Sequence, residues 1–142
     1  MDYTLMLVKP DAVQKHAVGR IIAWVEEEGF VIEGLRMLRL TREQAERFYA
    51  EHRERPFFAG LVAFMTSGPT VALLLRRDDA VSALRVLIGA TDSRKANEGT
   101  IRAAFGVDNQ MNAVHASDSP ASAARETAFF FNALDRIRVE DG

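Results

Sequence analysis

His115 is the side chain in this sequence best suited to act as a nucleophile or a proton carrier. The chain has three histidines and no cysteine, so few residues could form a covalent intermediate through nitrogen or sulfur. His115 lies in the run 112–119, NAVHASDS, which is rich in small residues. A neutral imidazole has one bare nitrogen that can attack an electrophile. The pattern therefore predicts a reactive histidine at the end of a short strand.

A histidine nucleophile works best when a partner orients its ring. Glu126 lies in the helix that we expect after the strand, and it could reach His115 directly or with Ser117 between them. The helix must fold back over the end of the strand for the two side chains to meet. Spacing allows this arrangement but leaves the alternative open, in which the histidine is satisfied in the core and the glutamate lies on the surface.

Three cations could serve the same site if the fold brings them together. Lys9 follows the first predicted strand, Arg85 lies on a predicted helix, and Arg102 lies in a long loop. Lysine offers a point charge and arginine a planar fork, and both suit phosphate oxygens. Thr91 and Tyr49 could add hydroxyl donors. Around a histidine such a set predicts phosphoryl transfer, although each cation taken alone is more often a solvated surface charge.

Two adjacent phenylalanines begin a predicted helix, in the run Arg55-Pro56-Phe57-Phe58. Neighbouring helical positions cannot both face the core. One ring is therefore a candidate to stack on a planar ligand such as a nucleobase, and a hydrophobic staple at the helix start is the alternative.

Length and composition predict one globular domain, residues 1–142. The chain is 48% hydrophobic and 27% charged, with a net charge of −2. That charge argues against a general nucleic-acid binder, and the sequence shows neither a secretory signal nor a run long enough to span a membrane. Walker-type phosphate loops and metal-ligand spacings are missing, and His16 and His52 read as surface residues. We expect a cytoplasmic protein with no membrane or nucleic-acid partner.

Periodicity and turn residues predict an α+β fold. Strands are expected at 3–8, 30–40, 70–75 and 112–114, with a bulge at Gly34. Helices are expected at 19–28, 57–65 and 121–134, the last of them capped by Ser119. Two more are expected, one that begins at a Thr41–Gln44 capping box and one that runs from Asp78 or Asp79 to Gly89. The connection 90–111 is long, with one helical stretch at 100–105. This order fits a ferredoxin-like four-stranded antiparallel sheet with helices on one face.

Five segments give the chain a close resemblance to the nucleoside diphosphate kinases, from Tyr3 to about Phe131. They are VKPDA at 8–12, RPFFAGLV at 55–62, SGP at 67–69, GTIR at 99–102 and NAVHASDS at 112–119. The resemblance implies a ping-pong exchange in which a nucleoside triphosphate phosphorylates His115 and the phosphohistidine then phosphorylates a nucleoside diphosphate. It also implies Mg²⁺ and a homo-oligomer, either a tetramer or a hexamer.

The resemblance also implies roles for individual residues. Glu126 and Ser117 would orient the histidine, and Lys9 would be both catalytic and phosphate-binding. Asn112 would contact the sugar and a phosphate oxygen, while Phe57 would stack on the base with Leu61 behind it. Magnesium would be held by the nucleotide, with no direct protein ligand and with Asp118 a candidate contact through water. The remaining phosphate-binding set would be Tyr49, Arg85, Thr91 and Arg102.

The chain departs from the family at several positions. Ala116 stands where glycine is usual, Ser93 and Glu98 where proline is common, and Asn109 at an often apolar position facing the base. Fewer prolines leave the unfolded loop about 0.4–1 kcal/mol more conformational entropy to lose at each position. We therefore expect Ser93→Pro to raise the melting temperature, and activity to survive at Ala116 unless that position needs a positive φ.

Two other functions use the same scaffold. A non-catalytic interaction protein is the main alternative, but the set Lys9, Arg85, Arg102, His115 and Glu126 is intact. An RNA-binding module would need exposed aromatic residues on central strands, whereas the run 71–75 is Val-Ala-Leu-Leu-Leu.

Overall fold

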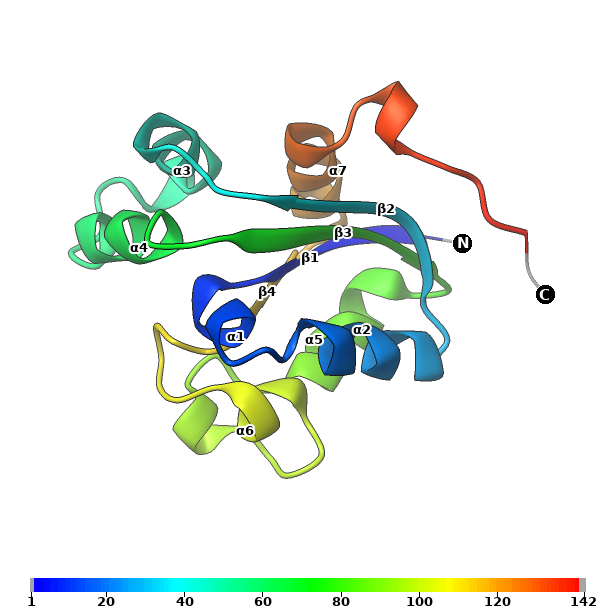
Figure 1. Cartoon of the computed structure of the whole chain (residues 1–142), viewed down its shortest axis with the longest axis horizontal. Coiled ribbons are helices and arrows are strands. Elements are labelled where there is room, and N and C mark those ends of the chain that lie inside the picture. Colours follow the sequence, from blue (N-terminus) through cyan, green and yellow to red (C-terminus); the bar gives the residue numbers. More distant parts are fainter. Residues whose placement is uncertain (1, 141–142) are drawn as a thin grey trace.

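A single four-stranded antiparallel sheet organises the protein, for which a computed structural model describes residues 2–140. The strands are β1 (Asp2–Val8), β2 (Val31–Leu38), β3 (Thr70–Arg77) and β4 (Val114–Ala116). Their order across the sheet is β2-β3-β1-β4 (Figure 1). The two strands in the middle are therefore the first and third in the chain, which confirms the ferredoxin-like α+β class.

Helices cover both faces of this sheet, so the expectation that they lie on one face was wrong. Helices α1 (Pro10–Gln14), α2 (Val18–Glu27), α5 (Ala80–Ile88) and α6 (Ile101–Phe105) pack on one face, and α3 (Arg42–Phe48), α4 (Phe58–Met65) and α7 (Pro120–Phe130) on the other (Figure 1). Met6 and Val8 of β1 belong to the first core, and Leu5 and Leu7 to the second. A strand with an unbroken apolar run has no face to leave in water.

Several local signals in the sequence formed as expected. Thr41 and Gln44 make a reciprocal capping box at the start of α3, and the Ser119 side chain caps α7 with Pro120 at its first position. The pairing of β2 with β3 shifts register between Ile32 and Gly34, which is the expected bulge. Each signal depends on residues close in sequence, and this is why it could be read without the fold.

The last strand begins two residues later than predicted, at Val114. Ala113 has a φ of 72°, and the Val114 N–H donates to the Asn112 carbonyl at 2.8 Å, which makes a γ-turn. A non-glycine residue in this region costs on the order of 1–3 kcal/mol. His115 therefore lies in the middle of β4, not after its end.

Other boundaries also differ from the sequence reading. The short helix α1 was missed, and α7 ends at Phe130, four residues before the predicted position. Asp79 is the N-cap residue of α5, but it adopts a φ of 53° and its side chain makes no capping bond. Three short 3₁₀ turns lie at Ala50–His52, Ser93–Lys95 and Ala133–Asp135. In the described part of the chain every helix is too short or too polar to span a membrane.

The structure gives a reason to revise the expected effect of Ser93→Pro. The Ser93 N–H donates to the Asp108 carbonyl at 3.2 Å, a bond that proline cannot make. Losing it costs about 0.5–1.5 kcal/mol, against the entropic gain of about 0.4–1 kcal/mol. We now expect no net rise in the melting temperature. Thermal unfolding of Ser93→Pro beside the wild type measures this, and a rise of several degrees would show that the bond contributes little.

Candidate active site

One cavity of about 320 Å³ collects almost all the side chains that the sequence singled out. It lies where the ends of β1 and β4 meet the loop 89–113, the region of α3 and α4, and the start of α7. The predicted residues that line it are Lys9, Tyr49, Phe57, Leu61, Arg85, Thr91, Arg102, Asn109, Asn112, His115, Asp118 and Glu126. Ser117 is fully buried beneath it. Residues from both ends of the chain therefore meet at a single site.

The central contact of the site joins His115 to Glu126. The imidazole Nε2 lies 2.8 Å from Glu126 Oε1, and the glutamate side chain is only 3% exposed, while 22% of the histidine side chain is exposed. An ionised carboxylate can only accept, so Nε2 carries the hydrogen and Nδ1 is left with its lone pair. The arrangement rejects the alternative of an unrelated core histidine and surface glutamate.

Two further donors hold the Glu126 carboxylate in place. Ser117 Oγ donates to Oε1 at 2.8 Å, and Arg125 Nη2 donates to Oε2 at 3.3 Å. Burial by itself opposes the charge of this group, but the hydrogen bonds from His115 and Ser117 outweigh it and lower the pKa of Glu126 below its ordinary value. The carboxylate is therefore ionised at neutral pH and can stabilise positive charge on the imidazole.

Aromatic rings fix the other sides of the imidazole. The Phe48 ring lies edge-on to His115, with centroids 5.4 Å apart, and the Tyr49 ring does the same at 6.1 Å. Tyr49 is only 5% exposed, and burial, with the charge of Glu126 adding to it, raises the pKa of its hydroxyl above the usual range. Tyr49 thus remains a neutral hydroxyl that can donate a hydrogen bond into the cavity.

Lys9 brings a buried ammonium group to the cavity. Its Nζ donates to the Gln110 carbonyl and to Asn112 Oδ1, both at 2.8 Å. Burial lowers the pKa of Lys9 to about 8, although the nearby carboxylate of Asp11 acts in the opposite direction. A lysine that has lost so much solvation gains more from an anionic ligand than a surface lysine does.

The two arginines lie beside β4. Arg102 is 4% exposed and donates from Nη1 to the Gly89 carbonyl and from Nη2 to the Val114 carbonyl, while its buried Nε has no partner among the described residues. Burial and the neighbouring charge of Arg85 lower the pKa of Arg102 to about 10. Arg102 remains a cation at neutral pH, and an anion between the two guanidinium groups would relieve their repulsion.

One part of the cavity combines an exposed aromatic ring with an aliphatic side chain. Phe57 is 50% exposed and lines the cavity, while the next residue, Phe58, packs against the core beneath α4. The prediction that the two rings would face different ways is thus confirmed. Leu61 lies one turn along α4, and Asn109 contributes a polar side chain to the same lining. Ala116, where the family usually has glycine, has no positive φ.

Sequence reasoning missed four residues of the lining. They are Glu51, His52, Gln110 and Val114. The sequence predicts a surface position for His52, yet its ring lies 5.4 Å from that of Phe57. Its position three residues after Tyr49 was the available signal, because residues at this spacing on a helical turn share a face.

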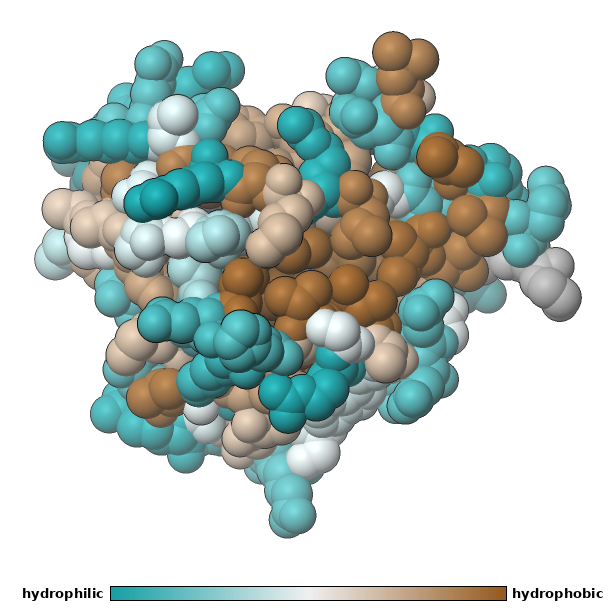
Figure 2. Space-filling view, viewed as in Figure 1, coloured by the Kyte–Doolittle hydropathy of each residue, from teal (hydrophilic) through white to brown (hydrophobic). Residues whose placement is uncertain are grey.

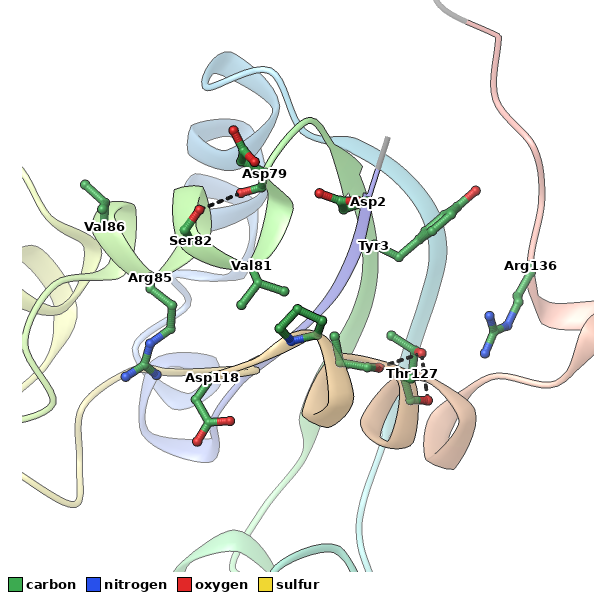
Figure 3. A pocket seen from close by; sticks show the side chains of 13 residues that line it. Asp2, Tyr3, Asp79, Val81, Ser82, Arg85, Val86, Asp118, Thr127 and Arg136 are labelled. Carbon is green, nitrogen blue, oxygen red and sulfur yellow. Dashed lines mark hydrogen bonds between the residues drawn. The ribbon is translucent and has the colours of Figure 1, made fainter.

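A larger open hollow of about 960 Å³ lies between α5, α7 and the start of β1, and it shares Arg85 and Asp118 with the first cavity. Its serine and threonine hydroxyl groups are used within their own helices, as Figure 3 shows. Ser82 Oγ donates to the Asp79 carbonyl at 3.2 Å, and Thr127 Oγ1 donates to the Ala123 carbonyl at 2.7 Å. The hollow also lacks His115, so the smaller cavity is the better candidate for chemistry.

A ferredoxin-like sheet carrying an oriented histidine beside buried cations defines a phosphate-handling site. Comparisons with known proteins agree with this class. The family model "Nucleoside diphosphate kinase" matches residues 2–135. The chain therefore belongs to the nucleoside diphosphate kinase family.

Individual relatives match over nearly their whole length. The nucleoside diphosphate kinase of Acidiphilium cryptum is 54% identical over 96% of this chain and 97% of its own. The Aquifex aeolicus enzyme structure has a TM-score of 0.94 at 50% identity, covering 96% of this chain and 99% of that one. The Halobacterium salinarum enzyme in complex with CDP has a TM-score of 0.96 at 39% identity, covering 99% and 93%.

The contact between His115 and Glu126 predicts the effect of removing the carboxylate. In Glu126→Ala the imidazole loses the acceptor that orients it, so we expect turnover to fall by about 10-fold or more, the scale known for partners that orient metal-binding histidines. Nucleotide affinity should change little, because the cations are untouched. Steady-state kinetics with an independent binding titration measures both, and an equal loss in the two would instead indicate a folding role.

Proposed function

We propose that this protein is a nucleoside diphosphate kinase that works by a ping-pong mechanism through a phosphohistidine at His115. The observation that carries the proposal is the bond of 2.8 Å between Nε2 and Glu126 Oε1. It fixes the neutral tautomer in which Nδ1 has a free lone pair, so Nδ1 is the proposed nucleophile.

Each half-reaction exchanges one bond to phosphorus. Nδ1 attacks the γ-phosphorus of a nucleoside triphosphate, the bond from that phosphorus to the β–γ bridging oxygen breaks, and the nucleoside diphosphate leaves with the electron pair. The ring becomes positively charged and retains the Nε2 proton, which Glu126 stabilises. In the second half-reaction, a terminal β-phosphate oxygen of another nucleoside diphosphate attacks the phosphohistidine, and the N–P bond breaks to restore neutral His115.

The cations supply most of the stabilisation in both half-reactions. Charge spreads over the phosphoryl oxygens in the transition state, and Lys9, Arg85 and Arg102 line the cavity in which those oxygens would lie. Tyr49 and Thr91 complete the proposed phosphate-binding set. Ser117 acts through Glu126, to which it donates.

Magnesium fits this site as a partner of the nucleotide. Mg²⁺ is usually bound through substrate phosphates and one or two carboxylates, and it keeps several waters. Asp118 lines the cavity, and a hydrogen bond from Ser122, which outweighs the effect of burial, lowers the pKa of its carboxyl. We propose that phosphate oxygens hold the ion and that Asp118 reaches it through water. When bound, the ion would neutralise charge on the phosphates.

The nucleoside part would lie between Phe57 and the loop that carries Asn109. Stacking on Phe57 with Leu61 behind it suits any base, because every base has a π-face. We propose that Asn112 contacts the sugar, because it lines the cavity and its amide lies next to Lys9 and the Thr91 carbonyl. Asn109 makes the wall opposite Phe57 polar, and the order of nucleotide preference would depend on how each base contacts it.

We also propose that the protein assembles as a homo-oligomer, a tetramer or a hexamer, through the part of the β2 edge that carries Leu35 and Met37. Leu35 and Met37 are 56% and 63% exposed on this edge strand. They pair with Leu73 and Val71 and therefore lie on the sheet face that α2 covers. Figure 2, which has the view of Figure 1 with β2 in front, shows apolar residues gathered at this edge of the sheet. An exposed apolar edge strand favours pairing with a second copy.

The remaining expectations stay predictions. They are a single domain over residues 1–142, a cytoplasmic location, and the lack of membrane or nucleic-acid partners.

A labelling experiment tests the proposed function. After incubation with γ-labelled ATP and magnesium, the wild type should carry an acid-labile, base-stable phosphate, because the N–P bond of phosphohistidine has that stability. His115→Ala should take no label, whereas His16→Ala should keep it, because His16 is exposed and does not line the cavity. Label on His115→Ala would refute the nucleophile, and an unlabelled wild type would favour the non-catalytic alternative.

The edge of β2 predicts the response of the assembly to charge. Leu35→Glu with Met37→Glu places two carboxylates on the proposed contact, so we expect the oligomer to dissociate. Size-exclusion chromatography with light scattering measures the mass of both proteins. A monomeric wild type, or an unchanged mass for the double variant, would contradict the proposed interface.

A further inference from the structure

The segment that follows β1 holds the segment that precedes β4 at four points. Lys9 Nζ donates to the Gln110 carbonyl and to Asn112 Oδ1, both at 2.8 Å. The Lys9 backbone N–H donates to the Ala113 carbonyl at 2.8 Å, and Asp11 Oδ2 accepts from the Ala113 N–H at 3.0 Å. The last two of these four contacts fix the two peptide groups of Ala113, one through its carbonyl and one through its N–H.

Ala113 has a backbone conformation that contacts from other segments must hold in place. Its φ of 72° lies in the left-handed region, and this γ-turn directs the chain into β4. Left-handed alanine persists only where its surroundings enforce it. His115 follows two residues later, and β4 has only the three residues Val114–Ala116. A change of backbone direction at Ala113 would therefore carry over to the imidazole.

The Asp11 carboxylate has no other hydrogen-bond partner among the described residues that would explain its position. It is 8% exposed, in the first turn of α1, and its Oδ1 is buried without a hydrogen-bond partner among the described residues. A buried carboxylate that makes one hydrogen bond is expensive to keep, so the bond it makes is the feature to explain. The neighbouring ammonium of Lys9 offsets part of that cost.

We propose that Asp11 is a positioning residue for phosphoryl transfer, because its carboxylate holds Ala113 in the left-handed turn that places His115 against Glu126. The proposal rests on the proposed function. Asp11 does not line the cavity and would touch neither the nucleotide nor the reacting atoms. It acts through the backbone that carries the nucleophile.

A double-mutant cycle between Asp11→Ala and Ala113→Gly tests this coupling. The readout is the rate of His115 phosphorylation at saturating ATP, with ATP affinity measured separately. Asp11→Ala should lower the rate at least tenfold. Glycine adopts a positive φ without strain, so the loss should shrink to a few-fold in the Ala113→Gly background. Equal losses in both backgrounds would overturn the proposal.

Asp79→Gly is the matched control background for the cycle. Asp79 is also left-handed, with a φ of 53°, but it is exposed at the start of α5 and makes no contact with Asp11. Here the full loss from Asp11→Ala should remain. A reduced loss in this background would show that glycine acts by a general effect on stability, and would overturn the proposal.

Asp11→Asn provides a second readout, which also decides the question if Asp11→Ala does not fold. Asparagine can still accept from the Ala113 N–H but carries no charge, so its loss in phosphorylation rate should be smaller than that of Asp11→Ala or of an unfolded protein. Three charges act on Lys9: Asp11 and Asp108 raise its pKa, and Arg102 lowers it.

Without the charge of Asp11, the pKa of Lys9 falls below its value of about 8. ATP affinity should then weaken at a lower pH in Asp11→Asn than in the wild type, an effect that a purely structural role would not produce. An unmoved pH profile together with a full loss of rate would overturn the proposal. If the wild type takes no label the proposed function fails, whereas a labelled wild type with equal losses in the cycle refutes only the role of Asp11.

Discussion

The buried hydrogen bond between Glu126 and His115 is the constraint on which the site depends. A carboxylate that is 3% exposed must be satisfied, and it is satisfied by the imidazole N–H, the Ser117 hydroxyl and Arg125. That requirement fixes the tautomer of the histidine and leaves the other nitrogen free. The same carboxylate lies ready for the positive charge that the ring gains when it is phosphorylated. Orientation and electrostatic stabilisation thus come from one contact.

The fold makes this contact by packing both faces of the sheet. Because β1 is buried on both sides, α7 can lie over one face and bring Glu126 back to β4. On the other side, α6 places Arg102 against the Val114 carbonyl. Lys9 and Arg102 are thereby removed from solvent, and neither forms an ion pair with a carboxylate among the described residues that would compensate for the lost solvation. Burial lowers the pKa values of Lys9 and Arg102 to about 8 and about 10. Because these cations are poorly solvated, an anion such as phosphate that enters the cavity would stabilise them.

The sequence predicted the fold class and most elements because their signals are local. The capping box at Thr41, the bulge at Gly34 and the proline after Ser119 each depend on near neighbours. The covering of both faces could have been read from the apolar run of β1, but the helix α1 is too short to show periodicity. The start of β4 could not be predicted, because the left-handed turn at Ala113 is held by Lys9 and Asp11 from the other end of the chain.

In the candidate site, too, residues with a local sequence signal could be predicted and residues brought together by the fold could not. The nucleophile and its carboxylate were identified from residue types, and the cations only through the resemblance to a family, since each reads locally as a surface charge. Gln110 was missed because nothing in its immediate sequence indicates a cavity, whereas His52 could have been found from its position three residues after Tyr49.

We propose that Nδ1 of His115 receives the phosphoryl group, because Glu126 occupies Nε2. The most direct test is NMR of the phosphorylated protein with ¹⁵N-labelled histidine, which identifies the nitrogen bonded to phosphorus. We expect coupling between phosphorus and Nδ1 of His115, with Nε2 still protonated. Phosphorus bonded to Nε2 would contradict the proposal, since that nitrogen could not then donate to Glu126.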